Sequence, residues 1–192
     1  MKKAWTWILI VLALAAVIFG AKYFYDYLGG DQLSGQLTPT EATQNETQST
    51  QPQRQFPPDF TAYDAQGNAV TLSQMRGKPV IVNFWASWCG PCKQEMPDFE
   101  AAYQTYGEDI IFMMVNLTDG QRETKESAQS HIAANGYTFP VYFDLDQSAA
   151  YAYNTVSIPA TYFYDADGYL VTRGLGALDA QTLEKGIQMI LN

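Results

Sequence analysis

The sequence contains little cysteine, little histidine and few basic residues. Its 192 residues include two cysteines, Cys89 and Cys92, and one histidine, His131. Two cysteines cannot hold together a disulfide-rich secreted scaffold, and they cannot form a four-cysteine zinc site. The 11 basic residues are outnumbered by 20 acidic ones, which gives a formal net charge of −9. We therefore expect no nucleic-acid partner, because phosphate binding needs lysine and arginine.

One long apolar segment lies near the N-terminus. In residues 4–21 the only polar side chain is that of Thr6, and no charge interrupts the run. Eighteen helical residues span about 27 Å, close to the ~30 Å hydrocarbon core of a bilayer. Aromatic residues that could lie at the two membrane interfaces occur at both ends: Trp5, Trp7, Tyr23, Phe24, Tyr25 and Tyr27. We therefore expect residues 1–28 to form a single transmembrane anchor with its flanks.

The basic residues around this segment indicate its orientation. Lys2 and Lys3 precede the apolar run, whereas Lys22 alone follows it. This bias favours a cytoplasmic N-terminus and an extracytoplasmic remainder. A cleaved signal peptide is the alternative interpretation. The run is long for a signal peptide, however, and Phe19 occupies the position where a cut after Ala21 needs a small residue.

The rest of the chain divides at about residue 55. Residues 29–55 are rich in Gln, Thr, Ser, Gly and Glu and are predicted to form a flexible polar linker. Residues 56–192 suit one compact domain. Within it we expect strands over 60–63, 69–71, 79–85, 110–117, 141–143, 161–164 and 169–172, and helices over 92–106, 124–135, 147–153 and 178–191. Strands that alternate with helices predict an α/β domain.

The residue pattern Cys89-Gly90-Pro91-Cys92 lies between a predicted strand and a predicted helix. The N-terminus of a helix carries free N–H groups and partial positive charge, and both stabilise a thiolate. We therefore expect Cys89 to be an exposed nucleophile and Cys92, three residues on, to be close enough to form a disulfide with it. Pro91 suits the first turn of a helix, where a missing N–H is tolerated. Half of a zinc site and a chance pair of cysteines are the alternatives, and this context favours neither.

Several motifs in sequence order resemble the membrane-anchored TlpA/ResA-type thiol-disulfide oxidoreductases of the thioredoxin superfamily. The resemblance covers about residues 56–192 and rests on residues 83–93 (NFWASWCGPCK), Pro58-Asp59-Phe60, Gly77-Lys78-Pro79, Glu95-Met96-Pro97, Phe139-Pro140-Val141, Ile158-Pro159-Ala160-Thr161 and Asp165-Ala166-Asp167-Gly168. It implies a thioredoxin-like fold, in which helices flank a central mixed sheet.

The resemblance also implies roles for individual residues. Pro159 matches a proline that is cis in the superfamily and faces the cysteine pair. Backbone groups of Ile158 are expected to pair with an extended substrate segment. Trp88 is expected to pack beside the motif, and together with Gly90 and Pro91 to contact the substrate.

Two positions differ from cytoplasmic thioredoxins. Those proteins usually have a buried, proton-transferring Asp where this chain has Asn83. Glu95 lies three residues after Cys92, which places both on one helix face. The resemblance to the TlpA/ResA type implies that a glutamate at this position lies near the cysteines. We expect Glu95 to manage the proton of Cys92, with a pKa raised by partial burial. The alternative is a solvated glutamate paired with a lysine.

The sequence therefore predicts a membrane-tethered, extracytoplasmic reductase of protein disulfides, in which Cys89, Cys92 and Glu95 are catalytic. We expect no metal and no organic cofactor. We expect a monomer in a bacterial cell membrane. The resemblance implies a membrane thiol transporter of the DsbD/CcdA type as electron donor, and apocytochrome c is a candidate substrate. A disulfide-forming oxidase and a tethered binding module remain alternatives. A peroxiredoxin-type peroxidase is a further one, but the chain lacks the Pro-x-x-x-Thr/Ser-x-x-Cys pattern before Cys89.

Overall fold

The computed structural model describes residues 37–39 and 56–191. The transmembrane anchor predicted over residues 1–28 lies outside this part of the chain. In the part that the structure describes, no helix is both long enough and apolar enough to cross a membrane. The linker predicted over 29–55 also lies outside it, except for three residues. These three form strand β1 (Leu37–Pro39), which pairs with a strand of the domain, so the prediction of a flexible linker is wrong for them.

Strands and helices alternate along the domain, as the sequence predicts. After β1 the elements are β2 (Thr61–Tyr63), β3 (Ala69–Thr71), the 3-10 helix η1 (Leu72–Met75), β4 (Val80–Trp85), α2 (Gly90–Tyr106), β5 (Ile111–Asn116), α3 (Lys125–Asn135), β6 (Val141–Phe143), α4 (Ser148–Ala152), β7 (Ala160–Tyr164), β8 (Leu170–Leu175) and α5 (Ala180–Leu191). The predicted elements are all present, with ends that differ by a few residues. The short helix η1 was not predicted.

The described strands form one mixed sheet in the order β1-β8-β7-β4-β5-β6-β2-β3. Strands β4, β5 and β6 are parallel neighbours, whereas β7 runs antiparallel to β4, and β8 runs antiparallel to β7. Strand β4 therefore lies inside the sheet, between β5 and β7, and all six of its residues are buried. A strand covered on both faces needs apolar residues throughout, which explains the run of β-branched and aromatic side chains.

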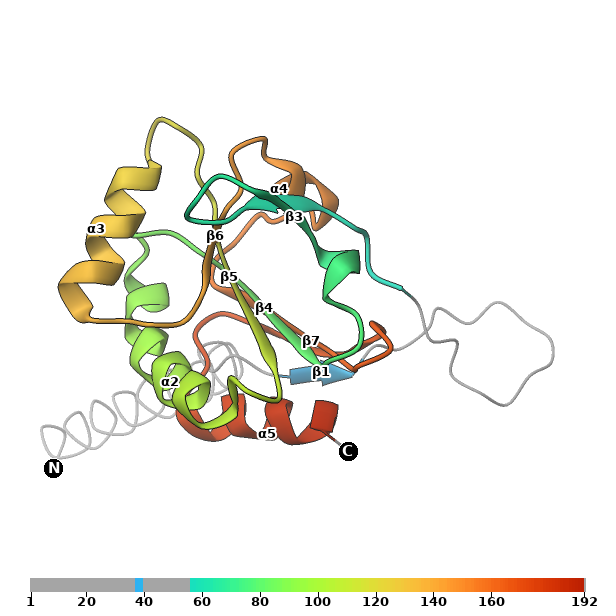
Figure 1. Ribbon diagram of the computed structural model, residues 1–192. Coiled ribbons are helices and arrows are strands. Elements are labelled where there is room, and N and C mark those ends of the chain that lie inside the picture. The colour runs from blue at the N-terminus through green and yellow to red at the C-terminus, as the bar shows by residue number, and fades with distance from the viewer. Residues whose placement is uncertain (1–36, 40–55, 192) are drawn as a thin grey trace, which may run out of the picture. The chain divides into compact units, whose positions relative to one another are not determined.

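Helices cover both faces of this sheet (Figure 1). Alternate residues of β4 face opposite sides, so that Ile81 and Trp85 join one core while Val82 and Phe84 join the other. The first core contains buried side chains of α2, α3 and α5, and the second contains those of η1 and α4. Because residues 86–89 connect β4 directly to α2, the cysteine pair lies at the carboxyl end of the central strand. Ligands and reacting groups commonly gather at this edge of an α/β sheet.

Candidate active site

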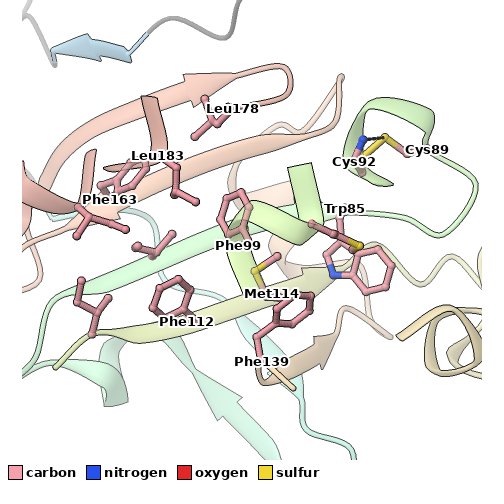
Figure 2. Close-up of a cluster of buried hydrophobic side chains, with 14 of the residues drawn as sticks. Trp85, Cys89, Cys92, Phe99, Phe112, Met114, Phe139, Phe163, Leu178 and Leu183 are labelled. Carbon is pink, nitrogen blue, oxygen red and sulfur yellow. Dashed lines mark hydrogen bonds between the residues drawn. A yellow bond between two sulfur atoms is a disulfide. The ribbon is translucent and has the colours of Figure 1, made fainter. Parts of the chain in front are cut away.

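A disulfide joins Cys89 and Cys92 at the start of helix α2. Cys89 is the N-cap of this helix, and Pro91 lies in its first turn. The backbone N–H of Cys92 donates to Cys89 Sγ over 3.2 Å. The sulfur of Cys89 therefore occupies the place where a free helix N–H meets an acceptor, and a thiolate there would receive the same hydrogen bond. Figure 2 shows the pair at one end of the buried cluster that includes Trp85.

The prediction that Cys89 is exposed is wrong for this disulfide form. Only 4% of the surface of Cys89 is accessible, and Cys92 is fully buried. The reason is local packing, since both cysteines belong to the same apolar cluster and Ile158 packs against it. Cys89 Sγ lies 3.8 Å from the carbonyl oxygen of Ile158. Reduction breaks the bond between the sulfurs, which then separate, so accessibility is a property to measure in the dithiol form.

The peptide bond between Ile158 and Pro159 is cis, as expected from the resemblance. It directly precedes β7, and β7 pairs with β4, the strand that leads to the cysteines. The contact between Cys89 Sγ and the Ile158 carbonyl confirms that this segment faces the disulfide. Its role in binding a substrate backbone stays a prediction.

Glu95 is buried rather than solvated, with 2% of its surface accessible. Its Oε1 accepts a hydrogen bond of 2.7 Å from Asn83 Nδ2, and its Oε2 accepts one of 2.8 Å from the backbone N–H of Leu178. Burial raises the pKa of Glu95 from 4.5 to about 7, although these two hydrogen bonds favour the charged form. The prediction of a raised pKa is confirmed, and the alternative of a surface glutamate paired with lysine is wrong.

Asn83 connects Glu95 to the neighbouring strand. Its Nδ2 donates to Glu95 Oε1 and also to Thr161 Oγ1, at 3.0 Å in the second case. The other amide atom, Oδ1, is buried and has no hydrogen-bond partner. An aspartate at this position would place two carboxyl groups side by side. The asparagine instead supplies a neutral donor to the carboxyl group that helix α2 provides.

The remaining predicted contact residues form an exposed rim beside the disulfide. Gly90 and Pro91 are exposed, and 41% of the surface of Trp88 is accessible. The guanidinium carbon of Arg122 lies 3.4 Å from the centroid of the Trp88 ring, a stacked cation–π contact. Trp88 therefore has one face covered by Arg122, which the sequence did not indicate.

Sequence reasoning also missed Glu123. This residue is fully buried, and its Oε2 accepts a hydrogen bond of 2.7 Å from Ser87 Oγ, two residues before Cys89. The two side chains are 36 positions apart in sequence. Nothing local to Glu123 distinguishes it from the other acidic residues of the domain. Only the parallel pairing of β4 and β5, which aligns the loops that follow them, brings the two together.

Metal-binding residues do not gather at this site. Among the described residues, no group of three or more His, Cys, Asp or Glu side chains is arranged to hold a metal ion. The fold brings the cis-proline segment against the sulfur of Cys89, and helix α2 carries the buried Glu95 carboxyl group three residues after Cys92. Their arrangement defines a thioredoxin-like centre for the exchange of thiols and disulfides.

Comparison with known proteins agrees with this class. Residues 53–173 match the model of the AhpC/TSA family, so the chain belongs to that family. The thiol-disulfide oxidoreductase ResA of Geobacillus kaustophilus is 32% identical over 134 residues, which cover 69% of this chain and 75% of ResA. The thioredoxin-like protein YneN of Bacillus subtilis is 31% identical over 132 residues, 69% of this chain and 76% of YneN.

A solved structure supports the same fold. The crystal structure of StoA from Bacillus subtilis superposes with a TM-score of 0.59 at 26% identity, covering 68% of this chain and 97% of StoA. The thioredoxin-like fold predicted from the sequence is thereby confirmed. With relatives of this kind and a disulfide at the start of α2, the chain is an enzyme, a thiol-disulfide oxidoreductase of the ResA and StoA type.

Proposed function

We propose that the protein is a membrane-tethered, extracytoplasmic reductase of protein disulfides. The observation that carries this proposal is the disulfide between the N-cap and the third residue of helix α2, with the Cys92 N–H directed at Cys89 Sγ. This placement stabilises a thiolate on Cys89 rather than on Cys92. Cys89 is therefore the group that attacks, and Cys92 is the group that resolves.

The reaction proceeds by two exchanges. In the reduced enzyme the Cys89 thiolate attacks one sulfur of the substrate disulfide, and the other substrate sulfur leaves as a thiolate that takes up a proton. Cys92 then loses its proton and attacks Cys89 Sγ. The mixed disulfide breaks, the second substrate thiol is released, and the enzyme is left oxidised. Two electrons have passed to the substrate, and exchange needs neither a metal nor an organic cofactor.

Glu95 is proposed to take the proton of Cys92. It lies one turn further along α2, is buried beside the same core, and has a pKa of about 7, near the operating pH that a general base requires. Replacing it in Glu95→Gln removes the charge while keeping the shape. The two-step titration of the reduced dithiol should then change, because a neighbouring carboxylate influences both thiols. Unchanged thiol titration would contradict this role.

The proposed anchor is supported by the N-terminal sequence, and the proposed partners by the resemblance to the TlpA/ResA type. Residues 4–21 are proposed to span a bacterial cell membrane with the N-terminus in the cytoplasm, so that the redox domain lies outside. A domain outside the reducing cytosol needs its electrons resupplied, and a membrane thiol transporter of the DsbD/CcdA type would do this. Apocytochrome c, with oxidised haem-binding cysteines, is the proposed substrate, and the enzyme is expected to act as a monomer.

Two other activities share this chemistry in part. An oxidase would use the same cysteines in the opposite direction and differs only in reduction potential. A peroxidase would need a proline seven residues and a hydroxyl residue three residues before its cysteine, and this chain has Val82 and Ala86 at those positions. The Gly90-Pro91 pair resembles that of reducing members, which supports the reductase.

Trapping tests the proposal. A Cys92→Ala variant retains the attacking thiol but cannot resolve, so it should accumulate mixed disulfides with its substrates in cells, which mass spectrometry can identify. The matched control is Cys89→Ala, which retains only the resolving cysteine and should trap nothing. Wild type should reduce a protein disulfide such as insulin, and Cys89→Ser should not. Equal trapping by both alanine variants would contradict the assigned roles.

A further inference from the structure

The cysteine pair is preceded by a tight turn that a distant loop holds in place. The turn comprises residues 86–89 and is closed by a hydrogen bond of 3.1 Å from the Cys89 N–H to the Ala86 carbonyl oxygen. Cys89 is both the last residue of this turn and the N-cap of α2. The position of its sulfur relative to the helix N-terminus therefore depends on how firmly the turn is fixed.

Glu123 accepts hydrogen bonds from Ser87, the second residue of this turn, with both carboxyl oxygens. Its Oε1 accepts the backbone N–H of Ser87 at 3.0 Å, and its Oε2 accepts Ser87 Oγ at 2.7 Å. A third hydrogen bond, 2.8 Å from Asn116 Nδ2 to Oε1, ties the same carboxyl group to the end of strand β5. Glu123 and Asn116 are both fully buried. A buried carboxyl group with three donors is a firm attachment, because charge-assisted hydrogen bonds are about twice as strong as neutral ones.

The loop that carries Glu123 is itself well supported. Asp119 Oδ1 accepts the N–H groups of Gln121 at 2.8 Å and of Glu123 at 2.9 Å, and the Gly120 N–H donates to the Glu123 carbonyl oxygen at 2.9 Å. The residue before Glu123, Arg122, stacks on Trp88, the third residue of the turn. Two consecutive loop residues therefore contact two consecutive residues of the turn.

We propose that Glu123 is a positioning residue for the redox centre. It holds Ser87 so that the turn presents Cys89 Sγ to the free N–H groups of α2, and it thereby sets how well the Cys89 thiolate is stabilised. Arg122 supports the same turn from the side of Trp88. This inference rests on the proposed attack by Cys89, and it adds a residue that touches neither sulfur and acts only through Ser87.

Substitutions of Glu123 can separate the effect of its hydrogen bonds from the effect of its negative charge. In Glu123→Gln the amide oxygen can accept the N–H groups of Ser87 and Asn116, and the amide nitrogen can donate to Ser87 Oγ, since a hydroxyl group also accepts. This variant keeps the three hydrogen bonds and removes the negative charge. Glu123→Ala loses all three hydrogen bonds, and Ser87→Ala loses one of them without removing a buried group from the loop.

The test measures the pKa of the Cys89 thiol in the full-length chain, in a Cys92→Ala background where Cys89 is the only thiol. The pH dependence of alkylation by iodoacetamide reports it, and urea unfolding confirms that each variant is folded. Glu123→Ala should raise the pKa by about half to one unit, because Cys89 is held less well at the positive end of the helix. Ser87→Ala should raise the pKa of Cys89 less. Glu123→Gln should give a pKa close to that of the parent.

The control is Glu100→Ala. Glu100 binds Thr138 in the same manner, because it accepts hydrogen bonds from the Thr138 backbone N–H at 2.7 Å and from Thr138 Oγ1 at 2.6 Å. It has no hydrogen bond to the turn before Cys89. It should leave the pKa of Cys89 unchanged. Two results would overturn the positioning role: a folded Glu123→Ala or Ser87→Ala variant with the parent pKa, or a Glu123→Gln variant shifted as far as Glu123→Ala. If the proposed function were wrong, the Cys92→Ala parent itself would form no mixed disulfides with substrates.

Discussion

The carboxyl group of Glu95 is the most strongly perturbed titrating group near the disulfide. Its burial favours the protonated form, and the hydrogen bonds from Asn83 and Leu178 only partly offset this. The consequence concerns stability as well as catalysis. A group that holds its proton more tightly in the folded state than in the unfolded state makes unfolding release a proton, so a rise in pH favours the unfolded chain.

The pH dependence of stability tests this environment. Between pH 4.5 and 7 the folded protein keeps the proton of Glu95 and the unfolded chain has lost it. The free energy of unfolding of the oxidised protein should therefore fall by up to about 3 kcal/mol relative to Glu95→Gln across this window, at 1.36 kcal/mol per pKa unit, and stay level above it. Urea titrations at several pH values measure the difference.

Glu100→Gln is the control for that series. Burial raises the pKa of Glu100, but hydrogen bonds from Thr138 and Gln104 outweigh it and lower the pKa below 4.5. The stability that ionised Glu100 provides is lost only at more acidic pH. The free energy of unfolding of wild type relative to Glu100→Gln should therefore not change between pH 5 and 7. The account of Glu95 would be wrong if Glu95→Gln and wild type followed parallel curves through this range.

At the scale of elements, the packing of α5 depends on one glycine. Gly186 is buried in the middle of α5, and a Cβ atom built on it would lie 2.5 Å from Cε1 and Cζ of Phe163 in β7. The backbone of α5 at Gly186 therefore packs directly against the aromatic ring of Phe163. Phe163 is itself fully buried, so it has no free space into which it can move.

Gly186→Ala should accordingly destabilise the protein. Alanine favours a helix over glycine by about 1 kcal/mol, whereas overpacking a filled core costs roughly 1–3 kcal/mol, so a net loss of about 1 kcal/mol is expected. Thermal or urea unfolding measures it. The exposed position Gln181 in the same helix provides the control, since Gln181→Ala should be nearly neutral. A Gly186→Ala variant more stable than wild type would refute the close packing.

Local sequence predicted the elements whose residues carry their own signal. The run of β-branched and aromatic residues from Val80 to Trp85 predicted a strand, and Gly136, with a φ of 68°, follows α3 directly after the predicted helix end at residue 135. The disulfide and the cis bond before Pro159 were likewise predictable from motif and resemblance.

The features that escaped prediction depend on contacts between distant segments. The burial of Cys89 depends partly on Ile158, which lies 69 positions away. The role of Glu123 depends on Ser87, and the strand at Leu37–Pro39 depends on pairing with β8. In each case the residue has no local feature that marks its partner. The burial of Glu95 was predicted from its position on the helix face of Cys92 and from the resemblance to the TlpA/ResA type.

At the scale of the whole molecule, charge and apolar residues are unevenly distributed along the chain. The formal charge of −9 comes from the domain, because residues 1–55 contain four basic and four acidic residues, whereas the other 7 basic and 16 acidic residues follow residue 55. The apolar run of residues 4–21 has no counterpart among the described helices. This distribution supports the proposed tether, since an apolar run can span a bilayer and net charge favours solubility of the domain.

Membrane fractionation tests the proposed anchor. The full-length chain should stay with the membrane after alkaline carbonate extraction, and external protease should reach the domain in spheroplasts, since the lysine bias places it outside. A chain in which Leu12 and Leu14 are replaced by lysine should be extracted, because charges at the bilayer centre are strongly disfavoured. Full extraction of the unmodified chain, or protection of its domain from protease, would contradict the proposed topology.

The reduction potential of the Cys89–Cys92 pair is the most direct test of the central claim. It is measured by equilibrating the full-length protein with glutathione or dithiothreitol buffers and quantifying the free thiols. A reductase should titrate as a single two-electron couple well below about −200 mV, in the range of thioredoxin rather than of strong oxidants. A potential near about −120 mV would identify an oxidase and contradict the proposed direction of electron flow.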